Sequence, residues 1–236
     1  MTDSEILKLE LPEITLEDVF QAQAADYSKR SPSQKVIDMH HKIMEEAKDL
    51  ISPTAVLCEI AVKSVGENQL ILEDGHTLNS ELLVKVANTA EKVLLFISTI
   101  GIAIEDRAAE YKKAGKRMEA FVCDPVGTAY SVISAYSTIE KIQKQYHDKG
   151  FKTTFPLRPG HSYWTHREDM KTIFKILRPE RIGIELTESN LIIPFKSIAM
   201  VVGIGKDLPD LNGKTNCDFC TMNDRCRSKN GTVAMC

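Results

Sequence analysis

The central part of the sequence carries a long helical pattern. Apolar side chains recur at intervals of three and four residues from about Pro125 to Tyr146, and Gly150 follows as a stop. They form one stripe, made by Val126, Ala129, Val132, Ile133, Tyr136 and Ile139. We therefore predict a long helix here that buries this stripe against the rest of the fold.

Segments typical of strands lie on both sides of this helix. Thr54–Val65 is rich in Val, Ile and Ala, Val93–Ser98 is a short apolar run, and Ile182–Gly205 is strand-like with polar interruptions. Further helices are predicted, one of them opened by a variant capping box from Thr15 to Asp18. Because helices and strands are segregated rather than strictly alternating, we predict an α+β fold with a mainly antiparallel sheet flanked by helices.

The character of the chain changes after Lys206. Asp207–Lys214 is rich in Pro, Gly, Asp and Asn, which is typical of a linker. A cysteine-rich segment follows it. We predict one α+β domain over residues 1–206, and a linker with a metal-binding tail over residues 207–236.

The composition excludes some function classes. The net charge of -3 argues against a broad nucleic-acid surface, which needs clustered Lys and Arg. The apolar runs are far shorter than the roughly 20 residues that span a bilayer, so we expect no membrane segment. The first residues are acidic and lack the pattern of a secretory signal, which predicts a cytoplasmic protein.

Cysteine usage is unusual. The chain has six cysteines, and four of them fall in the last twenty residues. In a reducing cytosol, clustered cysteines are more often metal ligands than disulfides. Four thiolates suffice for tetrahedral zinc or for an iron–sulfur cluster, and free or redox-active thiols are the remaining interpretation. The predicted metal ligands are Cys217, Cys220, Cys226 and Cys236.

Three segments, in chain order, resemble one family. Phe96–Tyr136 is similar to a stretch with the pattern TIG…D-x-x-G-(S/T), and Leu157–Leu177 to a Pro-Gly loop with the helix after it. Ile182–Gly205 fits the pattern IG-x-x-LT-(D/E)-S-x-x-x-x-P-x-x-S, which is the most specific of the three. Together they resemble the activation domain of cobalamin-dependent methionine synthase, and small stand-alone relatives carry a similar cysteine tail.

The resemblance implies a reaction and its participants. An activation domain of this family binds S-adenosylmethionine and docks on a corrinoid-binding domain. An electron donor protein reduces the inactive cob(II)alamin, and the bound sulfonium then methylates the cobalt. The protein itself supplies binding and orientation. No corrinoid-binding module is visible in the sequence, so the corrinoid would come from a partner protein, and an electron-donor role favours an iron–sulfur cluster in the tail.

The Pro-Gly loop supplies most of the predicted ligand-binding residues. The guanidinium of Arg158 can clamp the methionyl carboxylate with two charge-assisted hydrogen bonds, or be a surface arginine. Pro159 and Gly160 would let the backbone approach the ligand closely, although such a pair is commonly just a turn. Tyr163 and Trp164 could stack on adenine or face the sulfonium, or pack the loop against the core.

Three further positions, in different segments, are candidates for ligand binding. Methionine synthase has three residues between its Arg and Gly, where this chain has one, and His161 stands where an aromatic residue is expected. A family Glu is also replaced, so Asp124 is either the partner of the ligand's ammonium or a helix N-cap. Glu188 interrupts an apolar strand pattern, beside a predicted tight turn at Ser189-Asn190.

Two function classes follow. The first is a reactivation protein that binds S-adenosylmethionine and methylates a partner's corrinoid. The second is a non-enzymatic iron–sulfur or zinc module that docks on a corrinoid protein and passes electrons. Reuse of the fold for another small ligand is a third possibility.

Overall fold

The structure is a computed structural model that describes residues 4–24, 31–166 and 168–226. Its first half contains β1 (Glu5–Lys8), α1 (Leu16–Ala22), α2 (Gln34–Leu50), β2 (Thr54–Val65), β3 (Gln69–Leu72), β4 (Thr77–Asn79), α3 (Glu81–Ala87), β5 (Lys92–Thr99) and α4 (Ala103–Lys113). Its second half contains α5 (Arg117–Asp148), β6 (Lys152–Thr153), α6 (Glu168–Leu177), β7 (Glu185–Leu186), β8 (Ile192–Ile193) and β9 (Ser197–Gly205). Short 3-10 turns follow α6 and occupy the tail at Asn216–Phe219 and Asn223–Arg225.

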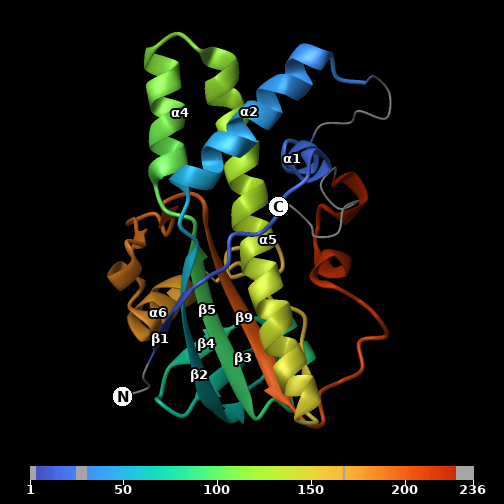
Figure 1. The fold of residues 1–236 in the computed structure, drawn as a ribbon. Coiled ribbons are helices and arrows are strands. Elements are labelled where there is room, and N and C mark those ends of the chain that lie inside the picture. Colours follow the sequence, from blue (N-terminus) through green and yellow to red (C-terminus); the bar gives the residue numbers. More distant parts are fainter. Residues whose placement is uncertain (1–3, 25–30, 167, 227–236) are drawn as a thin grey trace.

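A seven-stranded antiparallel sheet forms the centre of the fold. Its strand order is β4-β3-β2-β5-β9-β6, and β1 adds to β2. The predicted strand Thr54–Val65 is β2, and the run Val93–Ser98 lies within β5. A separate two-stranded hairpin is made by β7 and β8. The predicted antiparallel sheet with flanking helices is thus confirmed (Figure 1).

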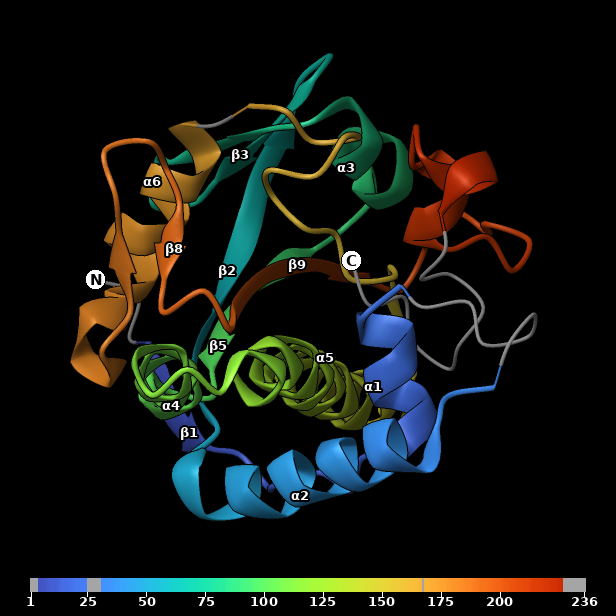
Figure 2. The ribbon, with the colours of Figure 1, turned by 90° about the horizontal axis from the view of Figure 1, so that it is seen from above.

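The central strands are buried on both faces. In β5, Val93 and Leu95 belong to an apolar cluster with α3 and α6, while Leu94 and Phe96 belong to one with α5. Neighbouring side chains of a strand point to opposite faces, so both clusters need apolar residues, and the strand reads as a continuous apolar run. Figure 2 shows α5, α4, α2 and α1 on one side of the sheet, and α3 and α6 on the other.

The long central helix starts earlier than the sequence predicts. Helix α5 begins at Arg117, so Pro125 lies inside it and not at its first turn. Proline removes one helical hydrogen bond, but Val122, Cys123 and Val126 around it are buried in the core. Packing in this region therefore outweighs local propensity. The interpretation of Asp124 as a helix N-cap is wrong for the same reason, because a residue within the helix cannot cap it.

Hydroxyl side chains cap the starts of two shorter helices, and the predicted capping box from Thr15 to Asp18 is one of these caps. The Thr15 hydroxyl accepts a hydrogen bond from the Asp18 amide, and the Asp18 carboxylate accepts one from the Thr15 amide. Ser80 caps α3 in the same manner, through the amide of Leu83. Within the described residues, none of the helices combines the length and apolarity needed to cross a membrane.

Candidate functional site

The Pro-Gly loop, residues 157–166, connects the sheet to helix α6. At its start, Leu157 and Val201 of β9 exchange backbone hydrogen bonds of 2.9 and 2.8 Å. Gly160 has φ +88°, a conformation that side chains with a Cβ rarely adopt. Its amide donates to the carbonyl of Trp164 at 3.0 Å, and the Trp164 amide donates to the carbonyl of His161 at 2.8 Å. The loop is therefore a compact turn built on the Pro-Gly pair.

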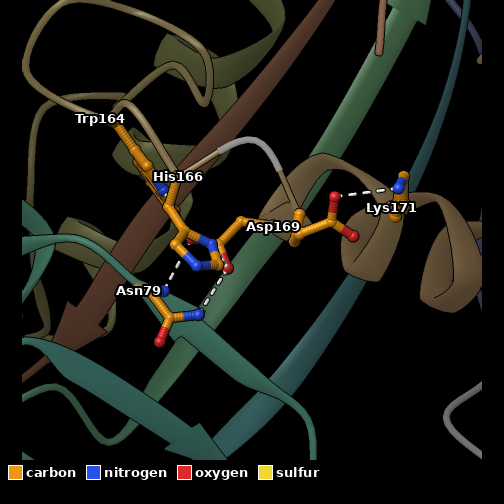
Figure 3. A network of polar contacts seen from close by, with 6 residues as sticks. Asn79, Trp164, His166, Asp169 and Lys171 are labelled. Carbon is orange, nitrogen blue, oxygen red and sulfur yellow. Dashed lines mark hydrogen bonds and ion pairs between the residues drawn. The ribbon is translucent and has the colours of Figure 1, made fainter. Parts of the chain in front are cut away.

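A buried carboxylate holds the far end of this loop. Asp169 in the first turn of α6 is 1% exposed. It accepts hydrogen bonds from the Asn79 amide (2.7 Å), the Asn79 side chain (2.8 Å), Trp164 Nε1 (2.8 Å) and His166 Nδ1 (3.2 Å). These donors come from β4 and from the loop, and Figure 3 shows them around the carboxylate. Because a buried charge needs such partners, Asp169 fixes the loop against β4.

Trp164 is part of this anchor. Its side chain is 1% exposed and packs in the apolar cluster with α3 and α6. The geometry therefore supports the interpretation that Trp164 packs the loop against the core. Tyr163 beside it is half-buried, and its hydroxyl accepts a hydrogen bond from the Arg158 amide at 3.2 Å.

Arg158, His161 and Tyr163 lie together at the loop surface. The His161 and Tyr163 rings are stacked, with centroids 4.7 Å apart and planes 25° from each other. Burial, and then the positive charge of Arg158, lower the pKa of the His161 imidazole. Among the described residues, no carboxylate lies within ion-pairing distance of the Arg158 guanidinium. The group thus combines an aromatic pair, a histidine that favours its neutral form and a cation open to an anionic partner.

A cavity of about 430 Å³ separates the Pro-Gly loop from the β7–β8 hairpin. It is lined by Gly160, His161, Ser162, Thr165, Met170, Ser189, Asn190 and Leu191. The hairpin turn is the predicted one, since Asn190 has φ 61° and its amide donates to the Thr187 carbonyl at 2.9 Å. Two segments singled out by the resemblance therefore face one cavity. Its volume is typical of small-molecule sites.

A second cavity of about 560 Å³ lies on the other side of the loop. Tyr163, Trp164 and His166 line it from the loop, Lys85 from α3, and Phe219 from the tail. Ser162 and Thr165 line both cavities. The loop therefore borders both cavities. Gly160 and His161 line the first, and Tyr163, Trp164 and His166 line the second.

The remaining predicted ligand residues lie apart from these cavities. Asp124 is exposed on α5 and pairs with Lys196, whose Nζ is 2.7 Å from Asp124 Oδ1 and 2.8 Å from Thr128 Oγ1. A Cβ on Gly127 would come within 3.3 Å of the Lys196 side chain. The D-x-x-G-T motif from Asp124 to Thr128 thus holds Lys196. Glu188 is exposed in the hairpin turn and Pro159 is buried. Neither of them lines either cavity, and nor does Arg158.

The cysteine tail has thiol chemistry that suits a soft metal, but its three described cysteines do not form a metal site. Cys217, Cys220 and Cys226 are half-buried, and Cys236 lies outside the described residues. Within the described part of the chain, no group of three His, Cys, Asp or Glu side chains is placed to hold a metal ion. The sulfur of Cys220 accepts hydrogen bonds from the Met222 amide (3.4 Å) and the Ser162 hydroxyl (3.6 Å).

Two features of this site escape sequence reasoning. Asp169 and Ser162 contact residues about 60 to 90 positions away, Asn79 and Cys220. The sequence shows two carboxylates at the start of α6, Glu168 and Asp169, but carboxylates are common in the first turn of a helix. The sequence therefore does not reveal that Asp169 is buried.

Comparison with known proteins supports the fold. No family model matches the chain, and no curated protein matches it in sequence. Among solved structures, the crystal structure of the MetH reactivation domain bound to AdoHcy is similar, with a TM-score of 0.64. The similarity covers 89% of this chain and 80% of that chain, at 12% sequence identity. At that identity the likeness establishes a shared fold.

Proposed function

We propose that the chain binds S-adenosylmethionine and uses it to reactivate a corrinoid carried by a partner protein. The observation that carries the proposal is the cavity between the Pro-Gly loop and the β7–β8 hairpin. Both segments come from the motifs that resemble the methionine synthase activation domain. The similar fold of a reactivation domain bound to AdoHcy supports the same class of ligand.

The loop residues suit the ligand's chemistry. Arg158 would hold the methionyl carboxylate, since its guanidinium has no carboxylate partner among the described residues and can form two parallel hydrogen bonds. His161 lines this cavity and could stack on the adenine or face the sulfonium, while Tyr163, stacked on His161, lines the second cavity. The lowered pKa of His161 keeps the imidazole neutral, so that it does not repel the positive sulfonium. Glu188 and Asp124 are weaker candidates, because neither lines the cavity.

The proposed reaction is a one-electron reduction of the corrinoid followed by a methyl transfer. An electron donor protein gives one electron to the partner's cobalt(II) corrinoid and forms cobalt(I). Cobalt(I) attacks the methyl carbon of the sulfonium, and the carbon–sulfur bond breaks with its electron pair remaining on sulfur. The products are methyl-cobalt(III) and S-adenosylhomocysteine. The chain's part is to bind the methyl donor and orient it toward the docked partner.

The cysteine tail extends the proposal to a metal. Cys217 and Cys220 form a Cys-x2-Cys start, and the Cys220 sulfur already accepts two hydrogen bonds. With Cys226 and Cys236 they would supply four thiolates for an iron–sulfur cluster or zinc. Folding of the tail around the metal would bring the ligands together, as is usual for small metal-binding segments.

Calorimetry of anaerobically purified protein with S-adenosylhomocysteine and S-adenosylmethionine tests the binding site. Loss of a charge-assisted hydrogen bond costs about 1.5–3 kcal/mol, so Arg158→Ala should weaken binding about 10- to 100-fold. Arg158→Lys should recover only part of the affinity, because an ammonium cannot form the two-pronged contact. Arg117→Ala, an exposed arginine at the start of α5, is the control and should bind like the wild type.

Two outcomes would contradict the proposal. Absence of binding by a folded protein would remove the methyl-donor role, and the electron-passing docking module would become the better description. If Arg158→Ala and the wild type bind with equal affinity, the protein binds the ligand but Arg158 does not contact it.

A further inference from the structure

The buried carboxylate of Asp169 orients one histidine of the Pro-Gly loop. Its Oδ2 accepts hydrogen bonds from the Asn79 amide at 2.7 Å and from Trp164 Nε1 at 2.8 Å, and its Oδ1 accepts one from the Asn79 side chain at 2.8 Å. All three partners are N–H groups that can only donate. Asp169 therefore acts as an acceptor on both oxygens, and His166 Nδ1, 3.2 Å from Oδ1, is the donor of the fourth bond.

A histidine that donates from Nδ1 has its lone pair on Nε2. In a neutral imidazole one ring nitrogen carries the proton and the other is an acceptor. The His166 side chain is 49% exposed and lines the second cavity, of about 560 Å³. Figure 3 shows its ring next to the carboxylate of Asp169. Within the described part of the chain, Nε2 has no hydrogen-bond partner, so it is the acceptor that this ring offers to a ligand.

The other residues of the second cavity suit a planar ring. The aromatic side chains of Tyr163 and Phe219 line it. Phe219 is held in place, because it stacks on Phe155 with ring centroids 5.8 Å apart, and the Lys85 ammonium lies 5.3 Å from its ring centroid. Lys85 and Glu81 line the cavity with opposite charges. The cavity therefore suits a neutral heteroaromatic ring that carries a hydrogen-bond donor.

The two cavities adjoin at the loop. Ser162 and Thr165 line both of them. Among the described residues that line the first cavity, of about 430 Å³, only His161 has an aromatic ring, and none is Lys, Arg, Asp or Glu. A ligand with an aromatic end and a positively charged aliphatic end thus finds a separate environment for each, and S-adenosylmethionine is such a ligand.

We propose that the second cavity is the adenine subsite of the S-adenosylmethionine site, and that His166 recognises adenine by accepting a hydrogen bond from its exocyclic amino group at Nε2. The inference rests on the proposed function and deepens it. The sulfonium then lies in the first cavity, next to His161. His166 is a specificity-determining residue, and Asp169 is a positioning residue that acts through it.

This hydrogen bond predicts a ligand preference that calorimetry can measure. The comparison is between S-adenosylhomocysteine and the analogue whose purine carries hydrogen in place of the amino group. The wild type should bind the analogue about 3- to 10-fold more weakly, which corresponds to one hydrogen bond between neutral groups. His166→Phe keeps a planar ring without Nε2, so it should bind both ligands equally. A loop that is only loosened would weaken both ligands alike and leave their ratio unchanged.

Nuclear magnetic resonance of the wild type gives a second readout, which does not depend on the folding of a variant. Proton–nitrogen spectra of isotope-labelled histidine distinguish a protonated ring nitrogen from a bare one. At about pH 8, where an ordinary imidazole is neutral, the assigned ring of His166 should be protonated at Nδ1 and bare at Nε2. The Nε2 signal should move when S-adenosylhomocysteine is added. Protonation at Nε2 instead, or an Nε2 signal that saturating ligand leaves in place, would refute the role of His166.

His41→Phe is the matched control for the binding experiment. His41 is an exposed histidine of α2 that lines neither cavity, so this variant should keep the wild-type preference. Equal binding of the two ligands by the wild type, or the wild-type preference in His166→Phe, would overturn the adenine subsite and leave the proposed function standing. Absence of S-adenosylhomocysteine binding by the folded wild type would instead overturn the proposed function and, with it, the subsite.

Discussion

Removal of the Asp169 carboxylate should loosen the Pro-Gly loop and destabilise the whole domain. Asp169→Ala leaves Trp164 Nε1 and the two donors of Asn79 without their acceptor, at distances that are now 2.7–2.8 Å. A buried donor left unpaired costs about 1–3 kcal/mol. The Trp164 bond is fully buried, and the Asn79 bonds are partly so, which gives a total of about 3–5 kcal/mol, similar to the cost of breaking a buried charge pair.

Urea denaturation followed by Trp164 fluorescence measures this loss, with a thermal melt as a second measurement. For a chain of this size, a loss of about 4 kcal/mol lowers the melting temperature by about 10 °C. Asp169→Asn should be intermediate, because it keeps one acceptor oxygen and turns an amide NH₂ toward existing donors. The matched control is Glu168→Ala, since Glu168 is the exposed neighbour that pairs with Lys171 at 2.9 Å. It should change stability by less than about 1 kcal/mol.

The two variants together decide the interpretation of Asp169. A loss below about 1 kcal/mol in Asp169→Ala, equal to that of Glu168→Ala, would refute the argument that the carboxylate anchors the loop. Ligand binding gives a second check, because an unanchored loop should also bind S-adenosylhomocysteine more weakly. A stable Asp169→Ala protein with unchanged affinity would show that the loop is held by its own backbone bonds.

Two further predictions concern pH and packing. Burial lowers the pKa of His161 in the folded protein below the ordinary histidine value of about 6.5. The unfolded chain therefore binds more protons between those two pKa values, and the free energy of unfolding falls as the pH drops below about 6.5. His161→Asn should flatten that part of a profile of the urea midpoint from pH 5 to 8, and an unchanged slope would contradict the assignment. A Cβ on Gly203 of β9 would lie 2.8 Å from the Cβ of Ala87 and 3.1 Å from Cγ2 of Thr154. Gly203→Ala should therefore lower the free energy of unfolding by about 1–3 kcal/mol through overpacking. An unshifted urea midpoint would show that α3 moves aside freely.

Local patterns were sufficient for most elements of the fold. The apolar segments predict β2 and β5, and the capping box predicts the start of α1, because these features depend on neighbours within a few residues. The sequence predicts that α5 starts near Pro125, whereas it starts at Arg117, because burial of Val122, Cys123 and Val126 around the proline outweighs its low helix propensity. The Pro-Gly loop and the turn at Ser189-Asn190 line one cavity, and this proximity comes from the tertiary structure.

The sequence by itself determined the class of fold, the turn at Gly160 and the chemical types available to the site, namely a guanidinium, aromatic rings and thiols. Only the tertiary structure decided which of these meet. It buried Trp164 on Asp169, paired Asp124 with Lys196, and placed Cys220 on Ser162. The reason is physical: periodicity and capping report interactions within a turn or a strand, whereas these contacts depend on how the sheet and its two helical layers bring distant segments together.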